Sequence, residues 1–333
     1  MKRIGIKLLF VLLGLVLAAF AAELAARKLD VWGVSYYRDV QQYFQRALEL
    51  PPGGASPENQ LFQNKPNVAL TDLKTFEYRT DERRLRTHVG RVVPENAMPV
   101  LFLGDSVTLC WGVDDEDTWV RRLEDLARAP DGRPLDCMNL GHLMFDTVQE
   151  AAILREFGPE LAPELVVLTF IYNDVHPTID QLPGSGITDT QAEPAGPIGR
   201  VLDRFFPTLR ELARFRAELR QVEHEDKTQF PPYSYYPSGW PRSAAALDDV
   251  KRTCEALGAR LVVHDKTEPV MPDVRAWCGS NGVVYVSTTF SEEDQRRYRN
   301  SVIDSHMNPE GNAIVAEMVA EQLFDAGVLA PAE

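Results

Sequence analysis

Two short and almost entirely apolar runs stand out in this 333-residue chain, Pro99–Leu103 and Leu165–Phe170. Runs this short are typical of strands buried on both faces, and such strands occur in parallel sheets. Further strand-like segments are expected at 135–140, 260–264 and 283–286. Helix-like segments separate or follow these strands, at 118–128, 147–157, 244–257, 270–278 and 309–325. This alternation predicts an α/β domain whose parallel sheet is covered by helices on both faces.

The predicted domain spans residues 98–330 and is interrupted by an insert at about 179–241. The insert opens with a stretch rich in Gly, Pro, Ser and Thr, and an amphipathic helical pattern follows at 201–222. Its place in the chain suggests that it covers the active face of the sheet. Residues 30–97 form a membrane-proximal extension, which we expect to pack on the domain.

The first 29 residues have the pattern of a signal anchor or a signal peptide. Three basic residues within the first seven precede an apolar run at 8–22, and the helical pattern continues to Leu29. Ala19-Phe20-Ala21 could serve as a cleavage site, but the continuing helix favours an uncleaved transmembrane helix. A buried helix of a soluble core is a third alternative, against which the basic flank argues. We therefore expect a single-pass anchor with the rest of the chain on the extracytoplasmic (periplasmic) side, or else a secreted protein.

The composition argues against one class of partner and leaves the state of the cysteines open. With 49 acidic and 35 basic residues the formal net charge is -14, which repels nucleic acid. The four cysteines lack the paired spacing of a zinc site. Cys254 and Cys278 could pair in an exported protein, or all four could be buried thiols. No metal or organic cofactor is expected.

Polar residues follow the predicted strands where parallel sheets carry their sites. Ser106, Gly141 and Asn173 follow three of the strands, and Asp304 and His306 precede the last helix. A hydroxyl nucleophile needs a base, and the base needs an orienting acid, which are the residue types of Ser106, His306 and Asp304. Acyl transfer also needs N–H donors for an oxyanion. We predict these donors at the backbone of Ser106, the backbone of Gly141 and the side chain of Asn173.

These four blocks resemble the SGNH hydrolases, a branch of the GDSL-type esterases named after Ser, Gly, Asn and His in that order. The matching blocks are LFLGDSVTLCWGV with Ser106, MNLGHLMFDTVQE with Gly141, LTFIYNDV with Asn173 and DSHMNPEGNAIVAEMV with His306. The segments GVDDEDTW and FEYRTDERRLRT resemble a membrane-anchored bacterial subgroup. The resemblance covers residues 98–323 and implies a flavodoxin-like three-layer α/β/α sandwich.

Two departures from the family pattern concern Asp304 and Val107. The family spacing is Asp-x-x-His, whereas here a single residue separates Asp304 from His306. Val107 replaces the Leu of the family name at a packing position. Each site residue also has a structural alternative as a helix cap, turn or surface residue. The other histidines, including His142, are expected to be structural.

The resemblance implies a serine esterase or acyl hydrolase that acts on ester-linked acyl groups of an envelope glycan or lipid, O-acetyl groups among them. Two alternatives stay open. The same site would serve an O-acyltransferase that modifies an exported polysaccharide, and a degenerate site would fit a non-catalytic envelope-binding protein. The intact Ser, Gly, Asn and His argue against the second alternative.

Overall fold

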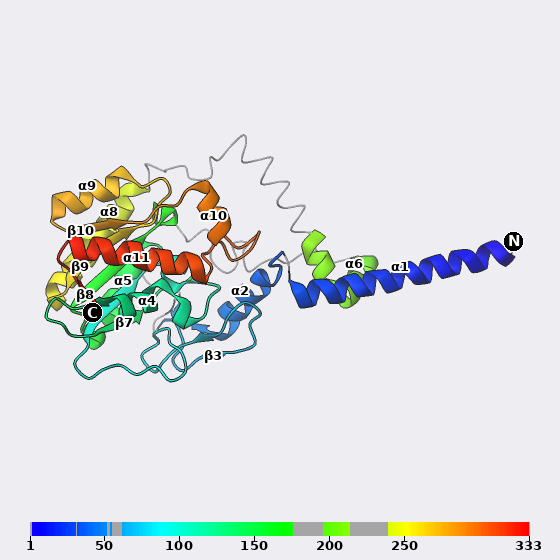
Figure 1. The fold of residues 1–333 in the computed structure, drawn as a ribbon, viewed down its shortest axis with the longest axis horizontal. Coiled ribbons are helices and arrows are strands. Elements are labelled where there is room, and N and C mark those ends of the chain that lie inside the picture. Colours follow the sequence, from blue (N-terminus) through cyan, green and yellow to red (C-terminus); the bar gives the residue numbers. More distant parts are fainter. Residues whose placement is uncertain are drawn as a thin grey trace.

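A five-stranded parallel sheet forms the centre of the protein (Figure 1). The computed structural model describes residues 2–30, 32–51, 54, 62–175, 196–213 and 239–332. The strands are β5 (Met98–Leu103), β7 (Leu135–Asn139), β8 (Leu165–Phe170), β9 (Arg260–Asp265) and β10 (Val284–Ser287). Their spatial order is β7-β5-β8-β9-β10, which is the flavodoxin-like order. The predicted fold class is therefore confirmed.

Helices cover both faces of the sheet because successive side chains of each strand point to opposite sides. On β5, Leu101 and Leu103 pack in one apolar cluster, and Val100 and Phe102 pack in another. The first cluster includes helices α5 (Thr147–Leu161), α8 (Trp240–Leu257) and α9 (Pro272–Asn281). The second includes α4 (Trp119–Leu126) and α11 (Pro309–Asp325). The molecule thus has the predicted three layers.

Among the described residues, the longest helix of the domain that was not predicted follows β10. It is α10 (Glu292–Tyr298), whose sequence EEDQRRY has no apolar stripe and of which only Tyr298 is buried. Ser291 begins it by accepting a hydrogen bond from Asp294 N–H (3.1 Å). Beyond the sheet, a short antiparallel pair joins β6 (Ala127–Arg128) to β11 (Ala330–Pro331) near the end of the chain.

The described residues between 30 and 97 form one helix and two short antiparallel pairs. The helix is α2 (Ser35–Arg46), and the pairs join β1 (Leu48–Glu49) to β2 (Gln63–Asn64) and β3 (Ala69–Leu70) to β4 (Tyr78–Arg79). The apolar side chains of this extension belong to the same cluster as the first face of the sheet. The extension therefore shares the core of the α/β domain.

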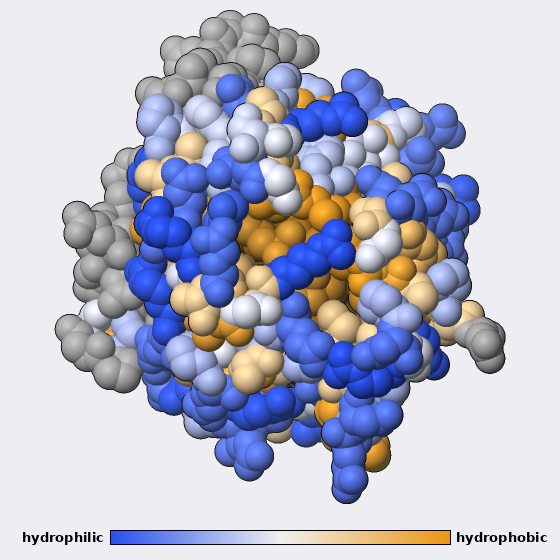
Figure 2. All heavy atoms as spheres, turned by 90° about the vertical axis from the view of Figure 1, so that its left-hand side faces the viewer, coloured by the Kyte–Doolittle hydropathy of each residue, from blue (hydrophilic) through white to orange (hydrophobic). Residues whose placement is uncertain are grey.

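Helix α1 (Lys2–Leu29) projects from the rest of the protein (Figure 1). Among the described residues, its segment Leu9–Leu29 is the one helix long and apolar enough to cross a membrane, with a mean hydropathy of 2.4. Membrane anchors and signal sequences share this property. The side of the molecule turned away from α1 is mostly hydrophilic around an apolar hollow (Figure 2).

The described part of the insert lies along α1 (Figure 1). Helix α6 (Pro197–Phe205) begins before the predicted helix at 201–222 and ends inside that range, with Phe206 as its C-cap. The parts of the insert at 179–195 and 214–238 lie outside the described residues. Within residues 196–213, Phe205 and Phe206 pack on Phe20 of α1. Coverage of the active face of the sheet by the insert stays a prediction.

Candidate active site

The turn after the central strand β5 presents Ser106 at the carboxyl end of the sheet. Glycine is required at position 104 for two reasons. A Cβ there would overlap the side chain of Thr108, and the φ of Gly104 is 154°, which other residues rarely adopt. Ser106 begins the short helix α3 (Ser106–Leu109), and Asp105 caps this helix by accepting from Val107 N–H (2.8 Å). The cap fixes the turn and leaves the Ser106 side chain partly exposed.

Asp105 also joins Ser106 to Asn173. Its Oδ2 accepts from Ser106 Oγ (3.2 Å) and from Asn173 Nδ2 (3.1 Å). Asn173 lies in a 3₁₀ turn at Tyr172–Val175 after β8, and Asp174 closes this turn by accepting from Ile171 N–H (2.7 Å). Strands β5 and β8 are neighbours at the point where the strand order reverses, which is the usual place of a site in such sheets.

His306 and Asp304 form a close pair in the loop before α11. The Nδ1–Oδ1 distance is 2.6 Å, and Asp304 Oδ1 also accepts from His306 N–H (3.0 Å). The one-residue spacing therefore still brings the carboxylate to the imidazole. Asn300 supports the pair by donating from Nδ2 to Asp304 Oδ2 (3.3 Å) and to Trp111 O (3.1 Å).

The electrostatics of this pair suit a base. Burial disfavours the charged imidazole, but the hydrogen bond to Asp304 and the negative charges of Asp304 and Asp105 outweigh it. The pKa of His306 is raised above 6.5 as a result. Burial raises the pKa of Asp105, while its hydrogen bonds and the charge of His306 act in the opposite direction.

Four of the five predicted site residues therefore meet at one edge of the sheet. Asp105 bonds both Ser106 and Asn173, and it is close enough to His306 for each charge to shift the pKa of the other. In this structure the Ser106 hydroxyl donates to Asp105, and His306 Nδ1 is bonded to Asp304. Rotation about χ1 of Ser106 to another staggered rotamer would release its hydroxyl from Asp105.

Gly141 is placed differently. Its N–H donates to Asn139 Oδ1 (3.0 Å), and Asn139 Nδ2 donates to Thr108 O (2.8 Å). A Cβ at Gly141 would overlap the backbone of Leu109. The glycine thus allows β7 and α3 to approach closely, and this arrangement does not support its predicted role as an oxyanion donor. The loop residue that contacts Asn173 is Phe145, whose carbonyl accepts from Asn173 Nδ2 at 3.4 Å.

Tyr36 of α2 is a site neighbour that the sequence did not indicate. Its ring centroid lies 6.2 Å from that of His306 and 6.3 Å from that of Trp111. Burial and the charge of Asp304 raise the pKa of Tyr36, so its hydroxyl is neutral at physiological pH. Tyr36 thus forms a wall beside the base, from the extension that the sequence predicted only to pack on the domain.

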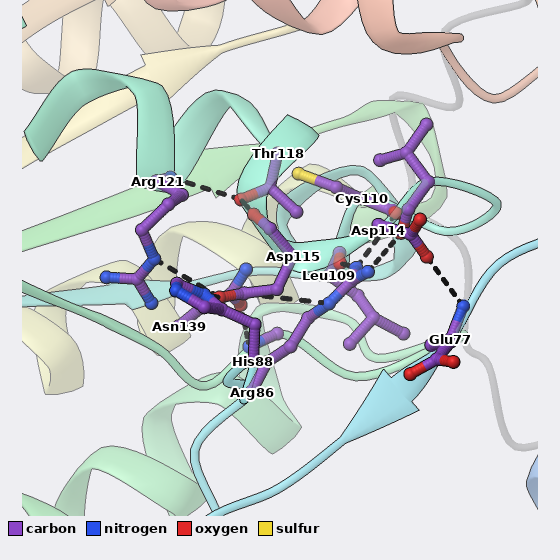
Figure 3. A network of polar contacts seen from close by, with 12 residues as sticks. Glu77, Arg86, His88, Leu109, Cys110, Asp114, Asp115, Thr118, Arg121 and Asn139 are labelled. Atoms are coloured by element: carbon purple, nitrogen blue, oxygen red, sulfur yellow. Dashed lines mark hydrogen bonds and ion pairs between the residues drawn. The ribbon is translucent and has the colours of Figure 1, made fainter. Parts of the chain in front are cut away.

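A buried arginine of the extension holds the loop that follows α3 (Figure 3). Arg86 donates to the carbonyls of Leu109, Cys110 and Val113. Asp115 lies beside it and binds His88 Nδ1 (2.8 Å) and Arg121 Nε (3.2 Å). The network joins the extension to the segment GVDDEDTW and gives His88 a structural role.

The remaining described histidines and cysteines are structural. His142 is buried, burial lowers its pKa to about 4, and its Nε2 accepts from Asn64 N–H (3.2 Å). His264 is likewise buried, and its Nε2 lies 2.8 Å from Thr288 Oγ1. All four cysteines are buried free thiols. Within the described ranges, no group of three or more His, Cys, Asp and Glu is placed to hold a metal ion.

Comparisons by sequence found no match, either to a protein-family model or to a curated protein. Solved structures similar to this chain include three bacterial proteins. One is described as lipolytic and of the G-D-S-L family, from Desulfitobacterium hafniense DCB-2. It is 10% identical with a TM-score of 0.40, over 68% of this chain and 99% of that one.

The second is a psychrotrophic esterase from Pseudoalteromonas sp. inhibited by monoethylphosphonate, at 11% identity and a TM-score of 0.41, over 68% of this chain and 97% of that one. The third is a GDSL-like lipase from Bacteroides thetaiotaomicron, at 14% identity and a TM-score of 0.37, over 72% and 93%. Two of these descriptions name the GDSL type, which is the family that the motifs of this chain predicted. The assignment of the site depends on the four motifs and on the geometry above.

Proposed function

We propose that this protein is a serine ester hydrolase with Ser106 as the nucleophile, His306 as the general base and Asp304 as the residue that orients the base. The observation that carries the proposal is the His306–Asp304 pair at 2.6 Å, next to the Asp105 carboxylate that bonds both Ser106 and Asn173. These groups come from three distant segments of the chain. A hydroxyl, an oriented imidazole and an amide donor are the parts that acyl transfer requires.

The proposed reaction has two steps. His306 Nε2 takes the proton of the Ser106 hydroxyl as Oγ leaves Asp105 and attacks the ester carbonyl. The tetrahedral intermediate collapses, and the alcohol leaves with the proton from His306. In the second step His306 takes a proton from water, the hydroxide attacks the acyl-serine, and the carboxylic acid leaves as Ser106 regains its proton.

Two donors are proposed for the oxyanion. One is the Ser106 N–H, at the N-terminus of α3. The other is Asn173 Nδ2, whose 3.4 Å contact with Phe145 O is long for a hydrogen bond and leaves one N–H available to turn toward the substrate. The Gly141 N–H is not included, because Asn139 already accepts from it. Removal of one such donor typically lowers turnover about a hundred- to a thousandfold.

The proposed substrates are ester-linked acyl groups, O-acetyl groups included, of an envelope glycan or lipid. We further propose that α1 is a membrane anchor with the catalytic domain on the extracytoplasmic side. Lys2, Arg3 and Lys7 precede the apolar span, which is the charge asymmetry of a chain whose N-terminus stays in the cytoplasm.

A fluorophosphonate probe tests the nucleophile. The folded full-length chain should be labelled at Ser106, and Ser106→Ala should not be labelled. Turnover of a chain-length series of esters then defines the acyl group. Incubation with an acetyl donor, with and without a glycan acceptor, separates hydrolysis from transfer to a sugar hydroxyl. Folded wild-type protein that neither reacts with the probe nor cleaves any ester would refute the proposal.

A further inference from the structure

The described part of the insert is held on α1 by specific contacts. The ring of Phe20 lies 4.8 Å from that of Phe206 and 6.2 Å from that of Phe205. Glu23, only 2% exposed, accepts from Thr208 N–H (3.0 Å) and from Leu209 N–H (2.9 Å). Arg27 also pairs with this carboxylate (2.6 Å). The buried Glu23 carboxylate thus accepts from three donors and ties the insert to α1. Cleavage after Ala21 would remove Phe20 and with it the ring contacts to Phe205 and Phe206.

These contacts lie within the apolar span of α1. Phe20 and Glu23 fall inside Leu9–Leu29, so whatever packs on them shares the surroundings of that span. The groove between the two helices has a volume of about 420 Å³ and is lined by apolar side chains alone, Leu12, Leu15, Val16, Ala19, Phe20, Phe205 and Phe206.

Helix α6 has the two faces of a helix that lies in a membrane interface. Val201 and Leu202 are 53% and 41% exposed, although both are apolar. Arg200 and Arg204, one turn apart, are also exposed, on the side of the helix away from Leu202. Exposed apolar area costs about 25 cal/mol per Å² in water. A helix with one apolar and one cationic face is stable at the boundary between lipid headgroups and acyl chains.

We infer that α1 is retained and that α6 lies beside it in the membrane interface, so that the two helices together dock the catalytic domain on the bilayer. The occupant of the apolar groove is the hydrocarbon of membrane lipid. The exposed apolar surface of α6 is continuous with that of α1 through the Phe20–Phe205 contact, which argues for one common surrounding. The inference rests on the proposed role of α1 as an anchor.

This arrangement holds the candidate active site close to the membrane. Gly33 follows the end of α1 and lies so close to Ser301, in the loop that carries Asp304, that a Cβ at position 33 would overlap it. Tyr36 lies beside His306. Between these segments is a cavity of about 390 Å³, which Tyr36 and Asp304 help to line. Esters presented at the membrane surface are therefore the substrates that the site reaches most readily.

Fluorescence in proteoliposomes tests the docking. A nitrobenzoxadiazole label at Leu202→Cys should emit blue-shifted light and be quenched by brominated lipid, and a label at Arg204→Cys on the opposite face should be quenched less. The four native thiols are buried and should not compete for the label. Labels at Leu13→Cys and Arg252→Cys mark the anchor and the solvent. A water-like spectrum at position 202 beside a quenched label at 13 overturns the docking, whereas an unquenched label at 13 overturns the anchor itself.

A kinetic comparison tests the consequence. The double variant Val201→Asp/Leu202→Asp should lose about tenfold in kcat/KM toward an ester embedded in vesicles, which corresponds to about 1.4 kcal/mol. Hydrolysis of a soluble short-chain ester should not change, and this rate also reports folding. Arg200→Ser/Arg204→Ser is the matched control on the polar face. If the double variant hydrolyses the vesicle ester at the wild-type rate, the inference is overturned. If wild-type protein is inactive on both esters, the proposed function is refuted, and the fluorescence experiment alone decides the docking.

Discussion

Asp105 holds two of the proposed catalytic groups at once. Its carboxylate accepts from Ser106 Oγ, from Asn173 Nδ2 and from Val107 N–H. The sequence places Asp105 only as a turn residue before the nucleophile, because its bond to Asn173 joins positions 68 residues apart. A contact at that separation depends on the pairing of β5 with β8, which no local pattern specifies.

Asp105→Asn should therefore change the pH profile as well as the rate. The negative charge of Asp105 helps to raise the pKa of His306, and its removal should lower that pKa. The acid limb of kcat/KM reports the loss of neutral His306, so it should move to lower pH in the variant. We expect turnover to fall about tenfold or more, since the new amide faces the Asn173 amide. A pH profile of soluble-ester hydrolysis measures both effects, and an acid limb that does not move would contradict the assignment.

Gly141→Ala should act on stability. The added Cβ would meet the backbone of Leu109, which cannot move aside as a flexible side chain does. Overpacking of this kind costs about 1–3 kcal/mol of unfolding free energy, measurable by urea denaturation. Gly279→Ala in α9 is the control, because nothing lies within 4 Å of its Cβ position. If Gly141→Ala instead kept full stability and lost turnover alone, the predicted oxyanion role of Gly141 would regain support.

At the scale of elements, the apolar runs predicted the strands and helices that bury an apolar face. Strands and helices with apolar faces were found close to their expected bounds, and α11 begins and ends where the pattern indicated. The charged α10 was missed because its sequence has no such face. The amphipathic pattern of the insert coincides in part with α6, but the contact of this helix with α1 was not predicted. One apolar face does not specify whether it meets a sheet, another helix or lipid.

Asp115, which links the extension to the loop after α3, should make the free energy of unfolding depend on pH in the acid range. Burial alone would raise the pKa of Asp115, but the hydrogen bond from His88 and the charges of Arg121 and Arg86 hold it at about 2. Because the pKa of Asp115 is lower in the folded than in the unfolded protein, its ionised form stabilises the fold. This contribution is fully present above the unfolded pKa of about 3.9 and is lost as the pH falls toward 2. This group should account for roughly 2 kcal/mol of that loss.

Asp115→Asn removes the titrating group and should remove its part of the acid dependence. The variant should be less stable than wild type at pH 7, because Arg86 and Arg121 lose their buried carboxylate. Its unfolding free energy should then fall less steeply between pH 4 and pH 2. Urea denaturation across this range measures the slope, and equal slopes in the two proteins would argue against a paired Asp115.

At the scale of the whole molecule, the extension shares one core with the domain that carries the candidate site, and two truncations can show it. Removal of residues 1–29 keeps Tyr36 beside His306 and leaves the shared core intact, so this chain should fold and should cleave a soluble ester at nearly the full-length rate. Removal of residues 1–50 also deletes α2 with the fully buried Tyr43, whose hydroxyl donates to Asn64 Oδ1 (3.0 Å).

Loss of one large buried aromatic side chain typically costs about 3–5 kcal/mol, which is a large share of the stability of a domain. The shorter chain should therefore be soluble only in part, and thermal unfolding and probe labelling of Ser106 should both show the defect. Tyr36→Phe in the 1–29 deletion should label normally, because the ring and not the hydroxyl contacts His306. If the 1–50 deletion were as stable and as reactive as the 1–29 deletion, the extension would be a tether to the anchor and no part of the site.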